Sequence, residues 1–265
     1  MSGRLLLAAF GLSSLAAHAA APQGMACLLK AYPDFFVAIR DDNHLQSRDG
    51  RVWPFDDGVH KADLEALLAQ ASLKDQLAQT YPAGFPVAVP ARDQDPGRIR
   101  HEALFLAMYG ASENAVRQHL RAVPWAPSGR SVLFTRLNGA DQALERVGQK
   151  LAENPALAAY VKQPAGTLNW RVIQGTNRRS AHSFAAAIDF QLPKNLGRYW
   201  QWSGCQANSP CTYPKALLED KSLRELVRVF EAEGFIWGGK WYHFDSVHFE
   251  YRPELVGPAC GNGPD

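Results

Sequence analysis

Two short stretches, far apart in the chain, constrain its fold and its chemistry more than any other feature. Residues 180–189 carry one imidazole and one carboxylate, His182 and Asp189, and residues 245–250 carry a second imidazole, His248. Two imidazoles and a carboxylate form a ligand set that suits a catalytic zinc ion, with a fourth position open for water and a base nearby. The sequence therefore predicts one Zn²⁺ site whose ligands are His182, Asp189 and His248. Asp245 is the predicted base.

The residues around Asp189 alternate between apolar and other side chains, which is typical of a β-strand. The apolar residues of segment 187–192 fall on one side of this strand and Asp189 falls on the other. His182 lies seven residues earlier, and this odd interval would put the two side chains on opposite faces of one continuous strand. We therefore expect His182 on a loop and Asp189 on a strand, with the small alanines at 185–187 letting the chain pass close to the metal.

The second stretch alternates in the same way, with apolar residues at the odd positions of segment 247–251. A strand there places His248 and Glu250 on one face, with Asp245 at the preceding turn. From that turn a carboxylate can take a proton from zinc-activated water and later pass it to the leaving amine. Glu250 is the alternative base, or else it supports a metal ligand by contacting the side of that ligand away from the metal. His243 is the alternative third ligand, although a packed or site-lining histidine is the simpler interpretation.

The rest of the chain mixes helical and strand-like segments, which predicts an α+β fold. Apolar residues at helical spacing, interrupted by prolines, predict a mainly helical N-terminal extension over residues 20–125, and residues 126–265 form the expected catalytic domain. Within that domain we expect strands at 131–137, 168–174, 235–239 and 247–251, and helices at 141–151 and 217–233.

Residues 1–19 fit a secretory signal peptide. Arg4 supplies the positive charge, residues 5–17 are apolar or small, and Ala17-His18-Ala19 fits a cleavage site. The apolar run is too short to cross a bilayer. We therefore expect a protein exported to the bacterial periplasm or the medium, with no membrane span once the signal is removed. A buried N-terminal helix is the alternative.

The four cysteines all follow the expected cleavage site. An even number of cysteines in an exported protein favours disulfides. Cys205 and Cys211 close a short loop, and a bridge there would leave Cys27 and Cys260 to join the two ends of the mature chain. Spacing alone leaves the connectivity open, and free thiols are the alternative.

The two stretches together resemble a known family. The patterns S-x-H…A-x-D and D-x-x-H-F-E resemble the zinc D-alanyl-D-alanine carboxypeptidases of the cell wall, a group that includes VanY-type carboxypeptidases and L-alanyl-D-glutamate endolysins. The segment Trp237-Gly238-Gly239-Lys240-Trp241 also resembles the family's pattern. The resemblance covers about residues 130–255 and implies the LAS metallopeptidase fold, a small antiparallel sheet with flanking helices. Ala185 replaces a glycine usual in the family, which is tolerable if the backbone there does not need a positive φ.

The resemblance also implies roles for residues around the metal. It gives the same zinc ligands and the same base, and it makes Ser180 and Trp241 substrate-binding residues. An arginine would polarise the scissile carbonyl or bind a terminal carboxylate, and Arg171 is the first candidate and Arg178 the second. The implied substrate is peptidoglycan or a muropeptide. A formal net charge of +2 does not supply the basic face that nucleic-acid binding requires, and we expect a monomer.

Three alternatives stay open at this point. Within the family, the reaction is that of a carboxypeptidase or of an endopeptidase. A non-catalytic cell-wall or peptide-binding protein could retain the fold, but it should have lost a ligand or the base, and all four positions are present. A wall-anchoring protein could depend on the N-terminal helices alone.

Overall fold

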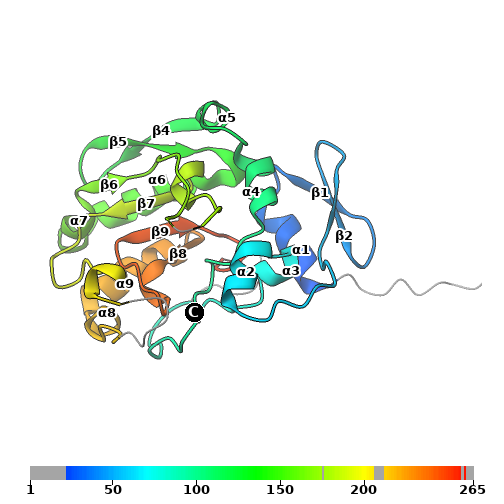
Figure 1. Ribbon diagram of the computed structural model, residues 1–265. Coiled ribbons are helices and arrows are strands. Elements are labelled where there is room, and N and C mark those ends of the chain that lie inside the picture. The colour runs from blue at the N-terminus through cyan, green and yellow to red at the C-terminus, as the bar shows by residue number, and fades with distance from the viewer. Residues whose placement is uncertain (1–21, 175, 206–211, 258–259, 261–265) are drawn as a thin grey trace, which may run out of the picture.

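The computed structural model describes residues 22–174, 176–205, 212–257 and 260 (Figure 1). In this part of the chain the strands form a three-stranded, a two-stranded and a four-stranded sheet, each antiparallel and accompanied by helices. This confirms the α+β fold class. The expected signal peptide, residues 1–19, lies outside the described residues. Among the helices that are described, none combines the length and apolar character needed to cross a bilayer.

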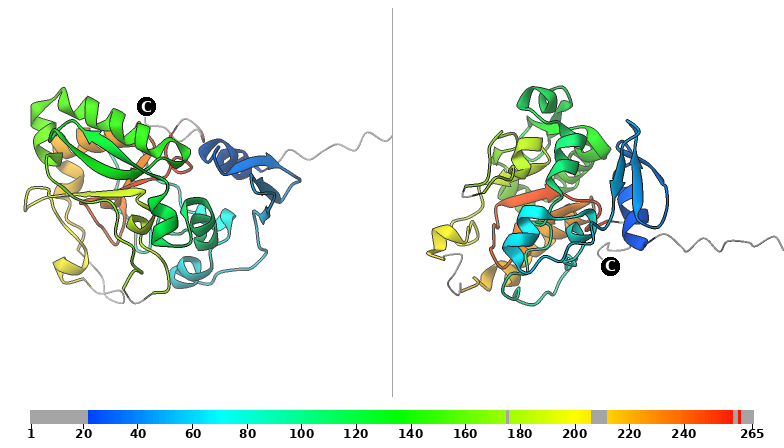
Figure 2. Two further views of the ribbon diagram at one scale, coloured as in Figure 1. Left: turned by 90° about the horizontal axis from the view of Figure 1, so that it is seen from above. Right: turned by 45° about the vertical axis from the view of Figure 1, so that its right-hand side comes forward.

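The N-terminal part contains both helices and a sheet. Its elements are α1 (Gln23–Ala31), β1 (Phe36–Ile39), β2 (His44–Ser47), β3 (Val52–Pro54), α2 (Leu64–Gln70), α3 (Leu73–Gln76), α4 (Glu102–Tyr109) and α5 (Glu113–Arg117). The sheet β1-β2-β3 forms one end of the molecule, and α2, α3 and α4 lie between it and the four-stranded sheet (Figures 1 and 2).

The remaining elements surround the four-stranded sheet, whose strand order is β6-β7-β9-β8. They are β4 (Leu120–Trp125), β5 (Arg130–Thr135), α6 (Ala140–Ala152), α7 (Pro155–Val161), β6 (Pro164–Gly166), β7 (Ala187–Phe190), α8 (Ala216–Glu219), α9 (Lys221–Glu231), β8 (Phe235–Trp237) and β9 (His248–Tyr251), with short 3-10 helices η1 (Leu137–Gly139), η2 (Ala181–Phe184), η3 (Gln201–Ser203) and η4 (Gly238–Lys240). The division of the chain at residue 125 stays a prediction, and the pairing of β4 with β5 crosses it.

Two expected elements differ from the structure. Residues 168–174 are not a strand, because their pairing with the arm that follows is limited to an isolated antiparallel bridge between Val172 and Arg179. Beside this bridge, Ile173 N donates to Arg178 O at 2.8 Å and Ser180 N donates to Arg171 O at 3.0 Å. The helix expected over 217–233 is divided at Asp220, whose side chain accepts a hydrogen bond from Leu223 N at 2.8 Å and so begins α9.

The four-stranded sheet presents one face to a helical core and the other to the metal-site stretches. Ile188 and Phe190 of β7 and Phe249 of β9 are buried in that core, where the Phe249 ring stacks on Phe230 of α9 with centroids 4.0 Å apart. Since side chains alternate along a strand, Asp189 and His248 point the other way. The alternation predicted for these two segments is confirmed.

A second core joins the N-terminal elements to the first metal stretch. Phe184 of η2 lies 5.7 Å, between ring centroids, from both Phe105 and Tyr109 of α4. A disulfide joins Cys27 of α1 to Cys260, with their Cα atoms 4.8 Å apart, as predicted. The other expected pair includes Cys211, which lies outside the described residues. Because Phe184 packs against α4, the N-terminal part of the chain supports the first metal stretch.

A buried ion pair helps to hold segment 81–84 against η4, where Lys240 Nζ also donates to the carbonyl oxygens of Pro82 and Gly84. Lys240 Nζ lies 2.6 Å from Glu231 Oε1, which also accepts a hydrogen bond from Tyr81 at 2.6 Å. Glu231→Ala would leave the Lys240 ammonium buried without its counter-ion, and we expect this to lower the free energy of unfolding by about 3–5 kcal/mol. Urea denaturation measures the loss.

The control for that experiment is Glu225→Ala, which removes an exposed carboxylate 3.6 Å from Arg228 on the same helix. Surface pairs contribute at most about 1 kcal/mol. Equal losses in the two variants would show that the buried pair has no special importance.

Candidate active site

His182 is held on η2 by contacts on both sides. Phe184 anchors the helix in the N-terminal core, and the Ser180 hydroxyl accepts a hydrogen bond from His182 N at 3.4 Å. The imidazole Nδ1 lies 3.0 Å from the carbonyl oxygen of Thr167. Because a carbonyl can only accept, Nδ1 carries the proton and the lone pair of Nε2 is left for a metal ion.

Asp189 and His248 are directly opposite each other on neighbouring antiparallel strands, β7 and β9. Residues paired in this way have side chains on the same face of the sheet. His248 Nδ1 lies 3.0 Å from Asp189 Oδ1, and His182 Nε2 lies 3.1 Å from the same oxygen and 3.2 Å from His248 Nδ1. The structure therefore brings the three predicted ligands together.

The spacing of these three atoms fits a tetrahedral zinc ion. Ligand atoms bound at 2.0–2.1 Å in a tetrahedral site lie about 3.3 Å from one another. His248 Nε2 lies 3.4 Å from Glu250 Oε2, so each imidazole has an acceptor for its second nitrogen, as metal-binding histidines generally do. His182, Asp189 and His248 are thus a group that could hold a metal ion.

The charge state of Asp189 also suits a ligand. Burial alone would raise the pKa of this carboxyl, but the hydrogen bonds with His182 and His248 outweigh burial and hold its pKa well below the usual range. The side chain is therefore ionised wherever the protein is folded near neutral pH.

Asp245 lies at the turn before β9, where Asp245 N donates to Gly238 O at 2.9 Å. A Cβ on Gly238 would lie 2.5 Å from the carbonyl oxygen of Asp245, so the close approach of the two segments requires a glycine. Asp245 Oδ1 is buried and has no hydrogen-bond partner among the described residues. Burial, together with the negative charge of Asp189, raises the pKa of Asp245 to about 6.

These groups open into a cavity of about 560 Å³. The residues predicted to bind substrate all line its wall: Arg171, Arg178, Ser180 and Trp241. Arg171 is exposed, whereas Arg178 is buried. The Trp241 ring lies 5.7 Å from that of His248 and donates from Nε1 to Pro96 O at 2.7 Å.

Arg98 and Arg100 also line this cavity, and sequence reasoning missed both. They belong to the segment before α4, about eighty residues ahead of the first metal stretch, and no motif marks them. The one available signal was the isolated run Gly97-Arg98-Ile99-Arg100, which places two cations on one side of an extended chain.

His243, the alternative third ligand, is bound elsewhere. Its Nδ1 lies 2.5 Å from Asp95 Oδ2, and its backbone N donates to Asp95 Oδ1 at 2.9 Å. Its ring lies on the cavity wall, 4.8 Å between centroids from Trp200. His243 is not part of the group of His182, Asp189 and His248.

Ala185 does adopt a positive φ. Its φ of 50° and ψ of 33° are left-handed, and its backbone N bonds to His182 O to end η2. We expected alanine to be tolerable here if the backbone did not need a positive φ, and the structure shows that it does need one. A left-handed residue other than glycine costs about 1–2 kcal/mol, which the packing around η2 must offset.

Comparison with known proteins agrees with this geometry. Residues 174–251 match the family model described as D-alanyl-D-alanine carboxypeptidase. This span contains His182, Asp189, His248 and Asp245, so the resemblance predicted from the motifs is confirmed for this part of the chain. The match supports a peptidase of the D-Ala-D-Ala carboxypeptidase type. No curated protein and no solved structure matches the chain.

Proposed function

We propose that this protein is a zinc-dependent peptidase that hydrolyses a peptide bond in peptidoglycan stem peptides. One observation carries the proposal: three donor atoms lie 3.0–3.2 Å from one another, in a cavity that also contains the carboxylate of Asp245. The match to the carboxypeptidase family supports the substrate class. A binding protein that had lost catalysis would be expected to lack one of these four side chains.

The residues of the chain have separate tasks in this proposal. When bound, a zinc ion would supply Lewis-acid polarisation of a carbonyl group and would acidify water. Asp245 accepts the proton of the attacking water at its free oxygen and returns it to the leaving amine. Ser180 and Trp241 hold the substrate, and an arginine of the cavity wall binds its carbonyl or carboxylate group.

The proposal predicts an acid limb in the pH dependence of hydrolysis. Only ionised Asp245 can accept a proton, and its pKa of about 6 is the upper bound, because a bound cation favours the charged form. We expect kcat/KM to fall as the pH drops through 6 or somewhat lower, and this limb should be missing in Asp245→Asn. A pH–rate profile of both proteins tests it.

Activity needs the ionised form of Asp245, whereas the stability of the metal-free protein is favoured by the protonated form. The folded pKa of this group lies above the unfolded value of 3.8, so protonated Asp245 stabilises the fold below that pH, and the contribution is lost as the pH rises through about 6.

Metal analysis paired with a muropeptide digest tests the function. We expect one zinc per chain and cleavage products that mass spectrometry assigns to one of two reactions. Loss of a terminal D-Ala indicates a carboxypeptidase, and a cut within the stem indicates an endopeptidase. Protein that is pure and folded but binds no stoichiometric metal, or leaves muropeptides intact, would contradict the proposal.

We also propose that the protein is exported. The pattern of residues 1–19 and the disulfide between Cys27 and Cys260 support export, since disulfides persist in oxidising compartments. Cell fractionation, with N-terminal sequencing of the mature chain, should find it outside the cytoplasm and beginning near Ala20.

A further inference from the structure

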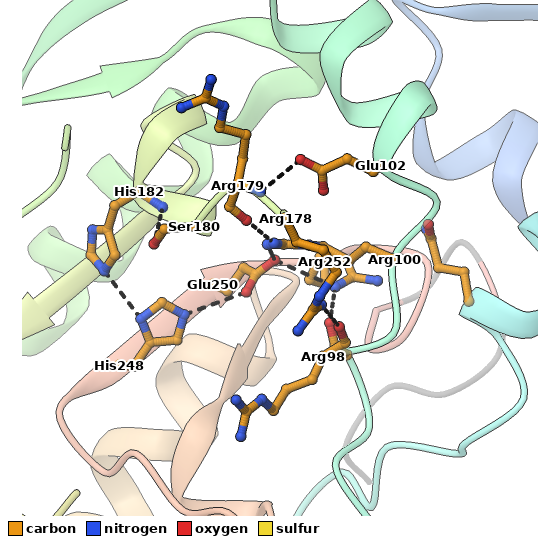
Figure 3. Close-up of polar contacts among 12 residues, drawn as sticks. Arg98, Arg100, Glu102, Arg178, Arg179, Ser180, His182, His248, Glu250 and Arg252 are labelled. Atoms are coloured by element: carbon orange, nitrogen blue, oxygen red, sulfur yellow. Dashed lines mark hydrogen bonds and ion pairs between the residues drawn. The ribbon is translucent and has the colours of Figure 1, made fainter. Parts of the chain in front are cut away.

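One part of the cavity wall is uncharged and aromatic. Many of the side chains that line the cavity are charged, and Figure 3 shows arginines gathered around Glu250 beside His248. Four consecutive residues of the same wall carry no charge, and three of them have aromatic rings: Tyr199, Trp200, Gln201 and Trp202. We call these four residues the aromatic rim. Such a surface suits a neutral ligand with an apolar face.

The indole ring of Trp202 is open to solvent. This side chain is 77% exposed, more than any other large hydrophobic side chain in the described part of the chain. Its ring meets the ring of Tyr199 edge to face, with the centroids 5.3 Å apart. A single exposed apolar side chain is ordinary on a protein surface, but a large ring at the edge of a cavity is well placed to add contact area for a ligand.

Backbone bonds hold the aromatic rim against the turn that carries the predicted base. Tyr199 and Asp245 form an isolated antiparallel bridge. Trp200 N donates to the carbonyl oxygen of Phe244, the residue before that base, at 2.9 Å. The rings therefore lie at a fixed place beside the proposed site of hydrolysis before any ligand binds, which lowers the entropy cost of binding.

The chemistry of the aromatic rim matches the flat face of a sugar ring. A pyranose carries several C–H groups on one face, and their partial positive charge is attracted to the negative face of an aromatic ring. Its hydroxyl and amide groups lie around the edge. The exposed amide of Gln201 and the phenol of Tyr199 supply uncharged donors and acceptors for them.

We propose that the aromatic rim is a saccharide subsite, which binds an N-acetylhexosamine joined to the stem peptide. The inference rests on the proposed function, because the stem peptides of peptidoglycan are joined through their N-terminus to such a sugar. A stem peptide in the cavity carries its sugar with it, and the aromatic rim is continuous with that cavity. The preferred substrate is then a glycopeptide, and an apolar side chain of the peptide is the competing occupant.

A matched pair of substrates tests the subsite on the full-length, metal-loaded enzyme. One is a disaccharide-peptide, N-acetylglucosaminyl-N-acetylmuramic acid joined to the stem peptide. The other is the same peptide with its N-terminus acylated by lactic acid, so that the two differ only in the sugar. We expect the wild type to show a KM about 3–10-fold lower for the glycopeptide, as one aromatic contact contributes. Its kcat should be the same for both, because the sugar takes no part in the reaction.

Variants of Trp202 then locate the effect. Trp202→Ala should cleave both substrates with the KM that the wild type has for the lactyl-peptide, and Trp202→Phe should retain part of the preference because it keeps a flat ring. Val52→Ala is the matched control, since Val52 is also an exposed apolar residue, at 55%, but does not line the cavity. It should keep the full preference. The Tm of Trp202→Ala should equal that of the wild type, because the lost side chain is mostly exposed.

A binding measurement does not depend on catalysis. Titration calorimetry on the metal-free protein should give a Kd about 3–10-fold lower for the glycopeptide than for the lactyl-peptide. This difference should be absent in Trp202→Ala.

The outcomes separate the two proposals. Cleavage of both substrates with equal KM by the wild type would overturn the subsite and leave the peptidase intact. A sugar preference that persists in Trp202→Ala would overturn it too, and so would an equal loss on both substrates, which would show that the ring contacts the peptide. Tighter, Trp202-dependent binding of the glycopeptide without cleavage would keep the subsite and refute the proposed reaction. If neither substrate is bound or cleaved, both proposals fall.

Discussion

His248→Ala should leave the protein without stoichiometric metal and without hydrolytic activity. The change removes one of three donor atoms that lie 3.0–3.2 Å apart, and it leaves Glu250 Oε2 facing an empty space. Even residues that only hydrogen-bond to a metal ligand alter metal affinity by about 10–100-fold, so losing a ligand should cost more than that. Inductively coupled plasma mass spectrometry of dialysed protein gives the metal content directly.

The matched control is His243→Gln, which changes another histidine of the same cavity. Because the His243 ring is bound to Asp95 and not to the metal group, this variant should retain its metal. The reverse pattern, with metal kept in His248→Ala and lost in His243→Gln, would mean that the ligand set is wrong.

Asp245→Asn should lower kcat by about 10²–10⁴-fold while the metal content stays at the wild-type level. The amide has nearly the shape of the carboxyl group but cannot accept a proton from water. Asp245 is not among the three residues grouped as ligands, and its free Oδ1 has no partner to lose within the described part of the protein. Steady-state kinetics, with metal analysis of the same preparation, measures both quantities.

Glu250→Gln distinguishes this base from its rival. The structure places Glu250 behind His248, where it bonds to the imidazole nitrogen away from the predicted metal position. We therefore expect Glu250→Gln mainly to weaken metal affinity, by about 10–100-fold, and to recover activity when excess zinc is added. If Glu250→Gln kept its full metal content but lost its activity, and Asp245→Asn stayed active, Glu250 would be the base and Asp245 would not.

The ligand geometry was predictable because strand alternation is a local property. The pattern of apolar residues at 187–192 and 247–251 fixes which face Asp189 and His248 share, and the pairing of β7 with β9 then sets them opposite each other. The odd interval from His182 to Asp189 predicted that the histidine lies off the strand, on a loop; it does lie off the strand, but in the short 3-10 helix η2.

Other parts of the site depend on contacts that no local pattern records. Arg98 reaches the cavity because Trp241 and the carbonyl of His243 hold it there, and these residues are more than 140 positions away. The left-handed backbone at Ala185 could be stated only as a condition, because alanine does not mark that conformation in a sequence as glycine does. Segment 168–174 alternates like a strand, yet its hydrogen bonds go to the neighbouring arm and to Ser183.

The burial of Phe184 against α4 bears on how this enzyme could be reduced in size. A minimal catalyst cut to residues 174–251 would lose Phe105 and Tyr109, which support η2, and the cation of Arg100, which steadies Glu250 behind His248. Anyone grafting these motifs onto another scaffold must therefore carry the N-terminal half along or rebuild its supporting surface from new residues.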